Sequence, residues 1–146
     1  MSDPQTAAVA AVRLVDVAEQ PGPPEETGDG SFHLVRRHFD VQAFGVNGST
    51  GNSGDVLITE HDEREDTSYG TEGHEELFVV ISGHAVFTVA GEQIDAPAGT
   101  LVFVRDPALV RTARATEDGT AILAVGGRPG VPFAVSRWEQ SIPPTG

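Results

Sequence analysis

Apolar residues along the chain come in short runs that are separated by glycine, proline and acidic residues. The run at 77–81 follows an imidazole and carboxylates and ends at a Ser-Gly turn pair. Runs of this length that contain β-branched and aromatic residues are typical of buried strands. Since side chains alternate along a strand, His74 and Glu76 would share one face with Phe78. Charged groups on an apolar face are costly without a partner, so this cluster lies at the wet end of the strand or binds something.

Further runs predict a series of short strands. We expect them at 56–59, 85–90, 93–95, 100–104, 110–115 and 120–125. Short strands at roughly eight- to twelve-residue spacing, punctuated by glycine or proline, predict an all-β sandwich or barrel. The segment at 47–54 consists of glycine, serine, threonine and asparagine and is expected to be a turn.

The first third of the chain is less regular. Residues 9–17 are compatible with a short helix or a strand, and the alternation near the end of this segment favours a strand. Residues 20–30 contain proline, glycine and glutamate and are expected to form a loop. Residues 32–44 are expected to form one or two strands that place His33 and His38 at the surface or at a sheet edge.

The whole pattern predicts one domain. With 146 residues the chain is long enough for a single core. We expect an N-terminal extension at 1–30, a barrel at 31–127 and a C-terminal arm at 128–146. The arm is expected to pack Phe133 and Trp138 on the barrel or on a second subunit.

Composition narrows the classes of function. The net charge is −13 and all nine basic side chains are arginines, a balance that opposes binding to nucleic acid or to an anionic membrane. The chain has no cysteine, which removes disulfides, thiolate ligands and a cysteine nucleophile. No apolar run is long enough for a membrane helix and the N-terminus has no secretory pattern, so we expect a cytoplasmic protein. Phosphate loops, dinucleotide fingerprints and nucleophile elbows are absent from the sequence.

The acidic residues are unevenly distributed. Nine of the 22 fall between Asp55 and Glu76, where only Arg64 opposes them. A solvated acidic loop and a cation site both fit this distribution, and both interpretations stay open.

Two spacings in the second half of the chain carry a family resemblance. Glu76 is followed after six residues by Gly83, and Gly91 is followed after five residues by Pro97-Ala98-Gly99. These spacings resemble the end of the first and the start of the second motif of the cupin family. The likeness runs from about residue 45 to about residue 127. It implies a single-domain, all-β cupin double-stranded β-helix, which is a jelly-roll barrel, and a homodimer.

The resemblance also implies a candidate metal site. Metal-binding cupins usually supply two histidines and a glutamate from the first motif and a histidine from the second. An ungapped alignment puts Glu72 and Gly70 at the two histidine positions. An insertion at 64–73 instead puts His61 and Glu63 there and leaves Glu76 in place. We favour the insertion, because the strand predicted at 56–59 then precedes these residues.

One nitrogen donor is still missing from this alignment, and His74, two residues before Glu76, could supply it. The candidate metal residues are therefore His61, Glu63, His74 and Glu76. Two imidazoles and two carboxylates suit a divalent transition metal such as Fe, Mn, Ni or Zn. The competing interpretation has His61 paired with a neighbouring acid while Glu76 is solvated.

The second motif departs further from the family. Its histidine position is Val102 or, with an insertion, Arg111, and neither is a metal ligand. The resemblance therefore leaves open whether a metal is bound at all. In a catalytic protein, His74 and Glu76 would act as general acid and base. Arg111 would orient a substrate anion through its fork of donors.

The resemblance implies a protein that acts on or binds a small organic molecule in the barrel. One possibility is a divalent-metal-dependent enzyme of the oxygenase, isomerase, cyclase or lyase type. The alternative is a non-catalytic, metal-free barrel that binds or senses a small molecule.

Overall fold

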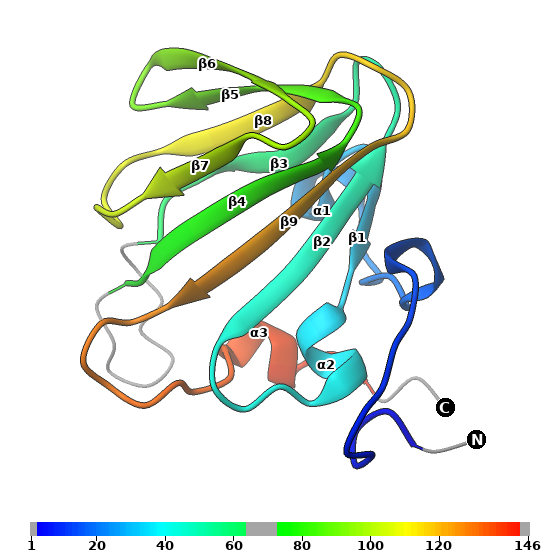
Figure 1. The fold of residues 1–146 in the computed structure, drawn as a ribbon. Coiled ribbons are helices and arrows are strands. Elements are labelled where there is room, and N and C mark those ends of the chain that lie inside the picture. The colour runs from blue at the N-terminus through cyan, green and yellow to red at the C-terminus, as the bar shows by residue number, and fades with distance from the viewer. Residues whose placement is uncertain (1–2, 64–72, 144–146) are drawn as a thin grey trace.

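The computed structural model describes residues 3–63 and 73–143, which form two antiparallel sheets with a few short helices (Figure 1). The strands are β1 (Ser31–His33), β2 (Gly45–Gly51), β3 (Val56–His61), β4 (Glu75–Ser82), β5 (His84–Val89), β6 (Glu92–Pro97), β7 (Leu101–Val104), β8 (Arg111–Ala115) and β9 (Thr120–Gly127). The helices are the 3-10 turn η1 (Leu14–Asp16) and the α-helices α1 (Pro24–Thr27), α2 (Val35–Phe39) and α3 (Arg137–Gln140).

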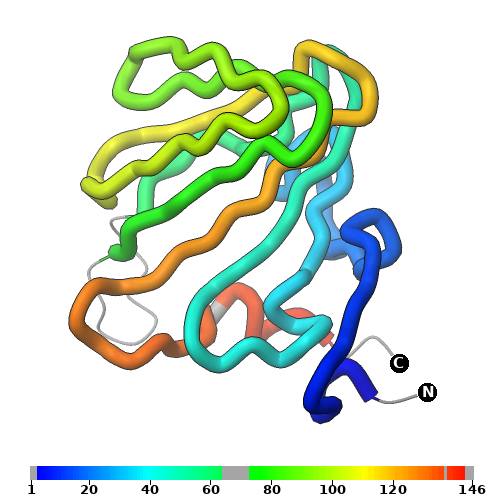
Figure 2. Tube along the Cα trace, in the orientation of Figure 1, coloured from blue at the N-terminus to red at the C-terminus, as the bar shows by residue number. Residues whose placement is uncertain are grey.

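The sheets pack face to face as a sandwich. One has the strand order β1-β2-β9-β4-β7 and the other has the order β3-β8-β5-β6. In the second half of the chain, β4, β7 and β9 belong to the first sheet, and β5, β6 and β8 belong to the second. The chain therefore crosses between the two sheets several times, and its path can be followed in Figure 2. This crossing places β4 in one sheet and β3 and β8 in the other, so residues far apart in sequence face each other across the interior.

The core lies between the two sheets. Phe78 and Val80 of β4 point inward and meet Phe87 of β5, with 5.2 Å between the Phe78 and Phe87 ring centroids. All three side chains are almost completely buried, as the alternation of apolar residues predicts. Every strand expected between 56 and 125 is present, and those predictions are confirmed.

The segment expected to be a turn at 47–54 is instead largely the strand β2, so that prediction was wrong. Its sequence has little β-propensity, but β2 pairs along one edge with β1 and along the other with β9. Backbone hydrogen bonds on both edges therefore stabilise a strand that the side-chain pattern does not predict. Gly48 also lets the chain from η1 approach closely, since a Cβ there would collide with the Leu14 side chain.

The predictions for the first third of the chain were wrong in three places. Residues 9–17 contain the turn η1 and no strand, the loop expected at 20–30 contains the short helix α1, and 32–44 contain the end of β1 followed by the helix α2. His33 lies at a sheet edge, on the edge strand β1, which confirms one of the two predicted positions. It is nevertheless buried there, because its ring nitrogens bond Val17 O and Thr50 Oγ1, each at 2.9 Å. These polar partners lie in other segments, so local sequence does not reveal them.

The C-terminal arm packs on the barrel. Trp138 lies edge-on against Phe32, with ring centroids 6.1 Å apart. The Arg36 guanidinium of α2 donates to Glu139 of α3 at 2.9 Å, and both side chains are buried. Figure 1 shows the two helices together at the end of the barrel where β2 begins and β9 ends. Within the described residues, no helix has the length and apolar character needed to cross a membrane.

Candidate functional site

The structure brings the candidate residues from both sheets to one end of the barrel. His61 is the last residue of β3 and Glu63 follows it by two residues. His74 directly precedes β4, and Glu76 is the second residue of that strand. Arg111 opens β8 and lies opposite His61 in the β3–β8 register. The alignment with an insertion thus names residues that lie together, whereas Gly70 and Glu72, which the ungapped alignment names, lie outside the described residues.

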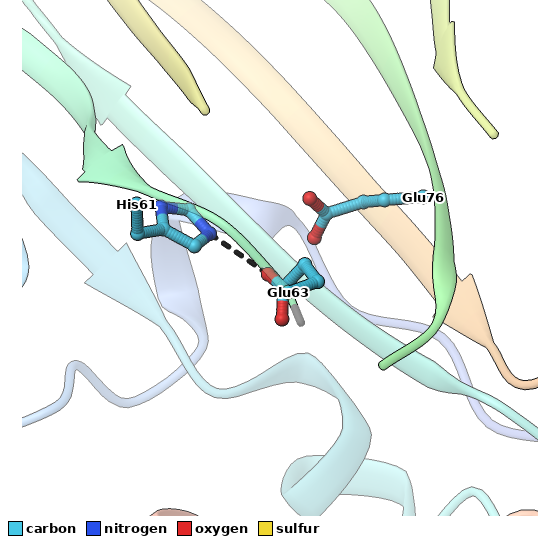
Figure 3. Close-up of side chains that lie close together, drawn as sticks. All are labelled: His61, Glu63 and Glu76. Carbon is cyan, nitrogen blue, oxygen red and sulfur yellow. Dashed lines mark hydrogen bonds and ion pairs between the residues drawn. The ribbon is translucent and has the colours of Figure 1, made fainter. Parts of the chain in front are cut away.

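Glu63 contacts both imidazoles. Its Oε1 lies 2.8 Å from His61 Nε2, and its Oε2 lies 3.3 Å from His74 Nε2. Figure 3 shows the first of these contacts, with the Glu76 carboxylate directed toward the same point from β4. His61 Nδ1 lies 2.6 Å from Thr59 O, and since a carbonyl only accepts, this nitrogen carries a proton. The nitrogen left to face the cluster is Nε2.

Arg111 is fully buried and is directed at Glu76. Its Nη1 donates to Glu76 Oε1 at 3.1 Å, and its Nε and Nη2 donate to Leu109 O at 3.1 and 2.8 Å. Its donors are thus used within the protein. This placement supports a role in holding the Glu76 carboxylate, in contrast to the expected role of holding a substrate anion.

Burial and neighbouring charges shift two protonation equilibria. Burial lowers the pKa of His61. The hydrogen bonds to Glu63 and Thr59, with the charges of Glu63 and Glu76, outweigh that effect and raise its pKa from 6.5 to about 9. Burial, together with the charge of Glu63, raises the pKa of Glu76 against the opposing effects of the two imidazoles and Arg111. With this pKa, His61 is a cation at neutral pH. Its positive charge favours the ionised form of Glu76, against the effect of burial.

The donors fit a metal ion. One ligand atom each from His61, Glu63 and Glu76 can be chosen so that all three lie within 4.8 Å of one another. Ligands at about 2.0–2.2 Å from a metal lie at most about 4.4 Å apart, so small side-chain movements suffice. The Thr59 carbonyl also holds the outer nitrogen of His61, which is the usual arrangement behind a ligating imidazole. Binding would require Nε2 to give up its proton.

Two glycines shape the space beside Glu76. Gly45, Gly126 and Glu76 lie opposite one another on the neighbouring strands β2, β9 and β4. A Cβ at Gly126 would lie 2.8 Å from His74 Cδ2, so the missing side chain is what lets that imidazole lie there. The sequence analysis missed these glycines, although glycine within a strand signals a close approach of this kind.

A cavity of about 800 Å³ opens from this cluster toward the C-terminal arm. At one end it is bordered by His61, Glu63, His74 and Glu76, which we call the floor. At the other end it is bordered by aromatic side chains from β1 and from the arm, including Phe32, Phe133 and Trp138. A volume of this size suits a small organic molecule, and the combination of apolar walls with a few polar groups is typical of ligand sites.

Comparison with known proteins identifies the family. The AraC-like ligand-binding domain matches residues 53–146. The chain belongs to this family. No curated protein matches the chain.

Solved structures related to this AraC-like domain show the cupin fold. A cupin protein from Bacteroides fragilis has 16% identity over 83% of this chain and 92% of that chain, with a TM-score of 0.57. A sugar phosphate isomerase of the cupin superfamily from Silicibacter pomeroyi has 16% identity over 82% and 76%, with a TM-score of 0.61. A predicted oxalate decarboxylase from Thermotoga maritima has 18% identity over 80% and 97%, with a TM-score of 0.54.

The resemblance and the fold predicted from the sequence are thereby confirmed: this AraC-like domain has the fold of the small, single-domain cupins. At the two candidate positions of the second-motif histidine, it has an apolar residue and a paired arginine. Val102 is buried in the core opposite Phe78, and Arg111 binds Glu76.

Proposed function

We propose that this AraC-like domain binds a small organic molecule in its cavity, beside a divalent transition metal ion at the floor. The ion, of the type Fe, Mn, Ni or Zn, would be held by His61, Glu63 and Glu76, with His74 as a further donor. The observation that carries the proposal is the grouping of one imidazole and two carboxylates within 4.8 Å at one end of a ligand-sized cavity.

The neighbours of the floor fit these roles. Arg111 holds the Glu76 carboxylate, and the Thr59 carbonyl holds His61 with Nε2 toward the cavity. Such an ion, when bound, supplies a Lewis acid that polarises an oxygen of the bound molecule. In a catalytic form in which His74 does not ligate the ion, it would accept or donate a proton at Nε2, where it contacts Glu63. The apolar wall around Phe78 would exclude water from that exchange.

Metal content and metal titration of untagged protein test the proposal. We expect near-stoichiometric binding of Mn²⁺ or Zn²⁺ by elemental mass spectrometry and calorimetry. His61→Ala and Glu63→Gln should weaken it at least about tenfold, because each removes a donor. His84→Ala is the matched control, since His84 also pairs with a carboxylate, Asp95, at 2.6 Å but does not border the cavity.

Equal affinity of His61→Ala and wild type, or no binding after reconstitution, would refute the metal site. A metal-free, non-catalytic ligand-binding or sensing domain would then be the better account. One observation favours it: the Arg111 guanidinium already supplies a buried cation to Glu76. Binding of an organic molecule that is unaffected by chelators would support this second candidate.

We also propose a homodimer. Leu101 and Phe103 of β7 and Ile81 of β4 are 63%, 44% and 51% exposed. In the β4–β7 register, Leu77 lies opposite Phe103 and Val79 lies opposite Leu101, so these apolar residues share the outer face of the sheet. A contiguous apolar face at the sheet edge suits a second copy of the chain. Phe32–Trp138 packing occupies much of the arm, which makes this face the better candidate interface.

A further inference from the structure

The end of the cavity away from the floor has two hydrogen-bond acceptors that the described part of the chain leaves without donors. Glu139 is 5% exposed, and its Oε2 receives Arg36 Nε at 2.9 Å. Its other oxygen, Oε1, is buried and accepts no hydrogen bond from any described residue. Asn47 Oδ1 is in the same situation. Both residues border the cavity.

The sheet register places Asn47 on the inner face of the barrel. Asn47 lies opposite Ala124 of β9, which lies opposite the core residue Phe78 of β4. Directly opposed residues share a face, so Asn47 points inward with them. Phe32 lies opposite Ser49, two residues along β2 from Asn47, and therefore shares that face.

Aromatic rings surround this end. Trp138 is edge-on to Phe32, and Phe133 packs over Gly45, where an added Cβ would lie 3.4 Å from its ring. We call Phe32, Asn47, Phe133, Trp138 and Glu139 the aromatic end of the cavity. Aromatic faces attract cations, most strongly where water is excluded.

The unpaired acceptors and the charged groups that border the cavity both indicate which kind of ligand the aromatic end would bind. A buried acceptor without a donor is destabilising, so a ligand that brings N–H groups is favoured. Five carboxylates border the cavity, against Arg128 and two imidazoles: Glu26, Asp62, Glu63, Glu76 and Glu139. Arg36 and Arg111 do not border it but pair with Glu139 and Glu76. The five carboxylates still outnumber these three guanidinium groups. An organic cation is therefore favoured over an organic anion.

We propose that the aromatic end binds a protonated amine, so that the ligand of this cavity is an organic ammonium compound. Its N–H groups would donate to Glu139 Oε1 and Asn47 Oδ1 while its apolar part lies among Phe32, Phe133 and Trp138. This inference rests on the proposed binding of a small molecule in the cavity, and it does not depend on the metal at the floor.

The protein carries its own reporter for this site, because Trp138 is the only tryptophan. Titrations followed by its fluorescence, and repeated by calorimetry, compare phenylethylamine with neutral phenylethanol and anionic phenylpropionate. We expect saturable binding of the amine with a Kd at least about tenfold lower than for the other two, since a charge-assisted hydrogen bond is worth more than a neutral one. Equal affinities, tighter binding of phenylpropionate, or no saturable response to phenylethylamine would overturn the proposal.

Variants locate the binding. Asn47→Ala should weaken amine binding about fivefold and Glu139→Gln about tenfold, through loss of one acceptor and of one charge. Asn47→Asp should strengthen it, a gain that a damaged fold cannot produce. Glu92→Gln, which neutralises an exposed acid on β6, is the matched control and should bind as wild type does. Unchanged amine binding in both Asn47→Ala and Glu139→Gln would refute the assignment.

A parallel Mn²⁺ titration of the same samples separates this inference from the proposed metal site. Amine binding that persists in His61→Ala, where Mn²⁺ binding is lost, would support both. If wild type bound the amine but no Mn²⁺, only the proposed metal site would be refuted. If it bound Mn²⁺ but not the amine, only the proposed amine site would be refuted.

Discussion

At the scale of single residues, the buried guanidinium of Arg111 determines the charge balance of the floor. It lies 3.1 Å from Glu76 Oε1 in a place without solvent exposure, close to a second carboxylate and two imidazoles. A buried charge that loses its partner is strongly destabilising, whereas removal of both partners is tolerated. The free energy of unfolding of the barrel therefore depends on whether the Arg111–Glu76 ion pair is intact.

Arg111→Met should lower the free energy of unfolding by about 3 kcal/mol, because Glu76 is left buried beside Glu63 without its cation. Urea denaturation measures this change. The double variant Arg111→Met/Glu76→Gln should recover much of the loss, since the uncompensated carboxylate is gone. Arg114→Met, an exposed arginine on the same strand, is the control and should change stability little. A double variant no more stable than Arg111→Met alone would show that the pair is not the cause.

The grouping of the floor residues and the pairing of His61 with a neighbouring acid could be predicted from sequence, but the partner of Glu76 could not. His61, Glu63 and Glu76 follow from motif spacing along two strands. The Arg111–Glu76 contact joins strands of different sheets that are separated by 35 residues in sequence. The 5% exposure and unpaired oxygen of Glu139 likewise depend on how the arm docks. Sequence periodicity carries no information on such contacts.

At the scale of secondary-structure elements, β9 fixes the position of His74. Glycine at 126 leaves room for the imidazole over the strand, since a Cβ there would lie 2.8 Å from His74 Cδ2. Gly127, the next residue, has no atom within 4 Å of the position of an added Cβ. Two adjacent glycines of one strand thus differ in whether a methyl group can be accommodated.

Gly126→Ala should displace His74 from Glu63, because the added methyl group would lie 2.8 Å from the ring and 3.1 Å from a backbone oxygen. We expect a changed His74 resonance in NMR spectra and a loss of metal affinity of about tenfold. Gly127→Ala should leave both unchanged. If the two variants gave the same His74 resonance and the same affinity, β9 would not position this imidazole.

A strand could be predicted where its own side chains alternate between apolar and polar. The strands from β3 to β9 follow from alternating apolar residues. β2 does not, since the residues that pair it belong to β1 and β9, and its own sequence apart from Val46 is glycine, asparagine, serine and threonine. α2 was missed because its Arg36 is stabilised by α3, a hundred residues later in the chain.

At the scale of the whole molecule, described residues near both ends of the chain are bound to Arg37 of α2. Gln5 Nε2 donates to Arg37 O at 2.8 Å, and the Arg37 guanidinium donates to Ile142 O at 2.9 Å. The arm is thus fixed to its own barrel. That arrangement leaves the outer face of β4 and β7 as the broad apolar surface for a partner.

Light scattering after size-exclusion chromatography should show a dimer, since burial of Leu101, Phe103 and Ile81 against a second copy removes exposed apolar area from water. Phe103→Glu should shift the protein to a monomer with its circular dichroism unchanged. Val131→Glu, at an exposed apolar residue outside the strands, serves as the control and should stay dimeric. A monomeric wild type, or a dimeric Phe103→Glu variant, would contradict this interface.

The chain leaves the site at Glu63 and returns to it at Gly73, and both residues lie against Pro107. Glu63 N donates to Pro107 O at 2.9 Å, and Gly73 is so close to Glu63 O and Pro107 that a Cβ there would collide with both. The entropy of closing a loop rises only slowly with loop length. Insertions and deletions between these two anchors are therefore nearly neutral for the donors on either side. The number of residues between Glu63 and Gly73 should therefore be open to change by engineering without displacing either anchor from Pro107.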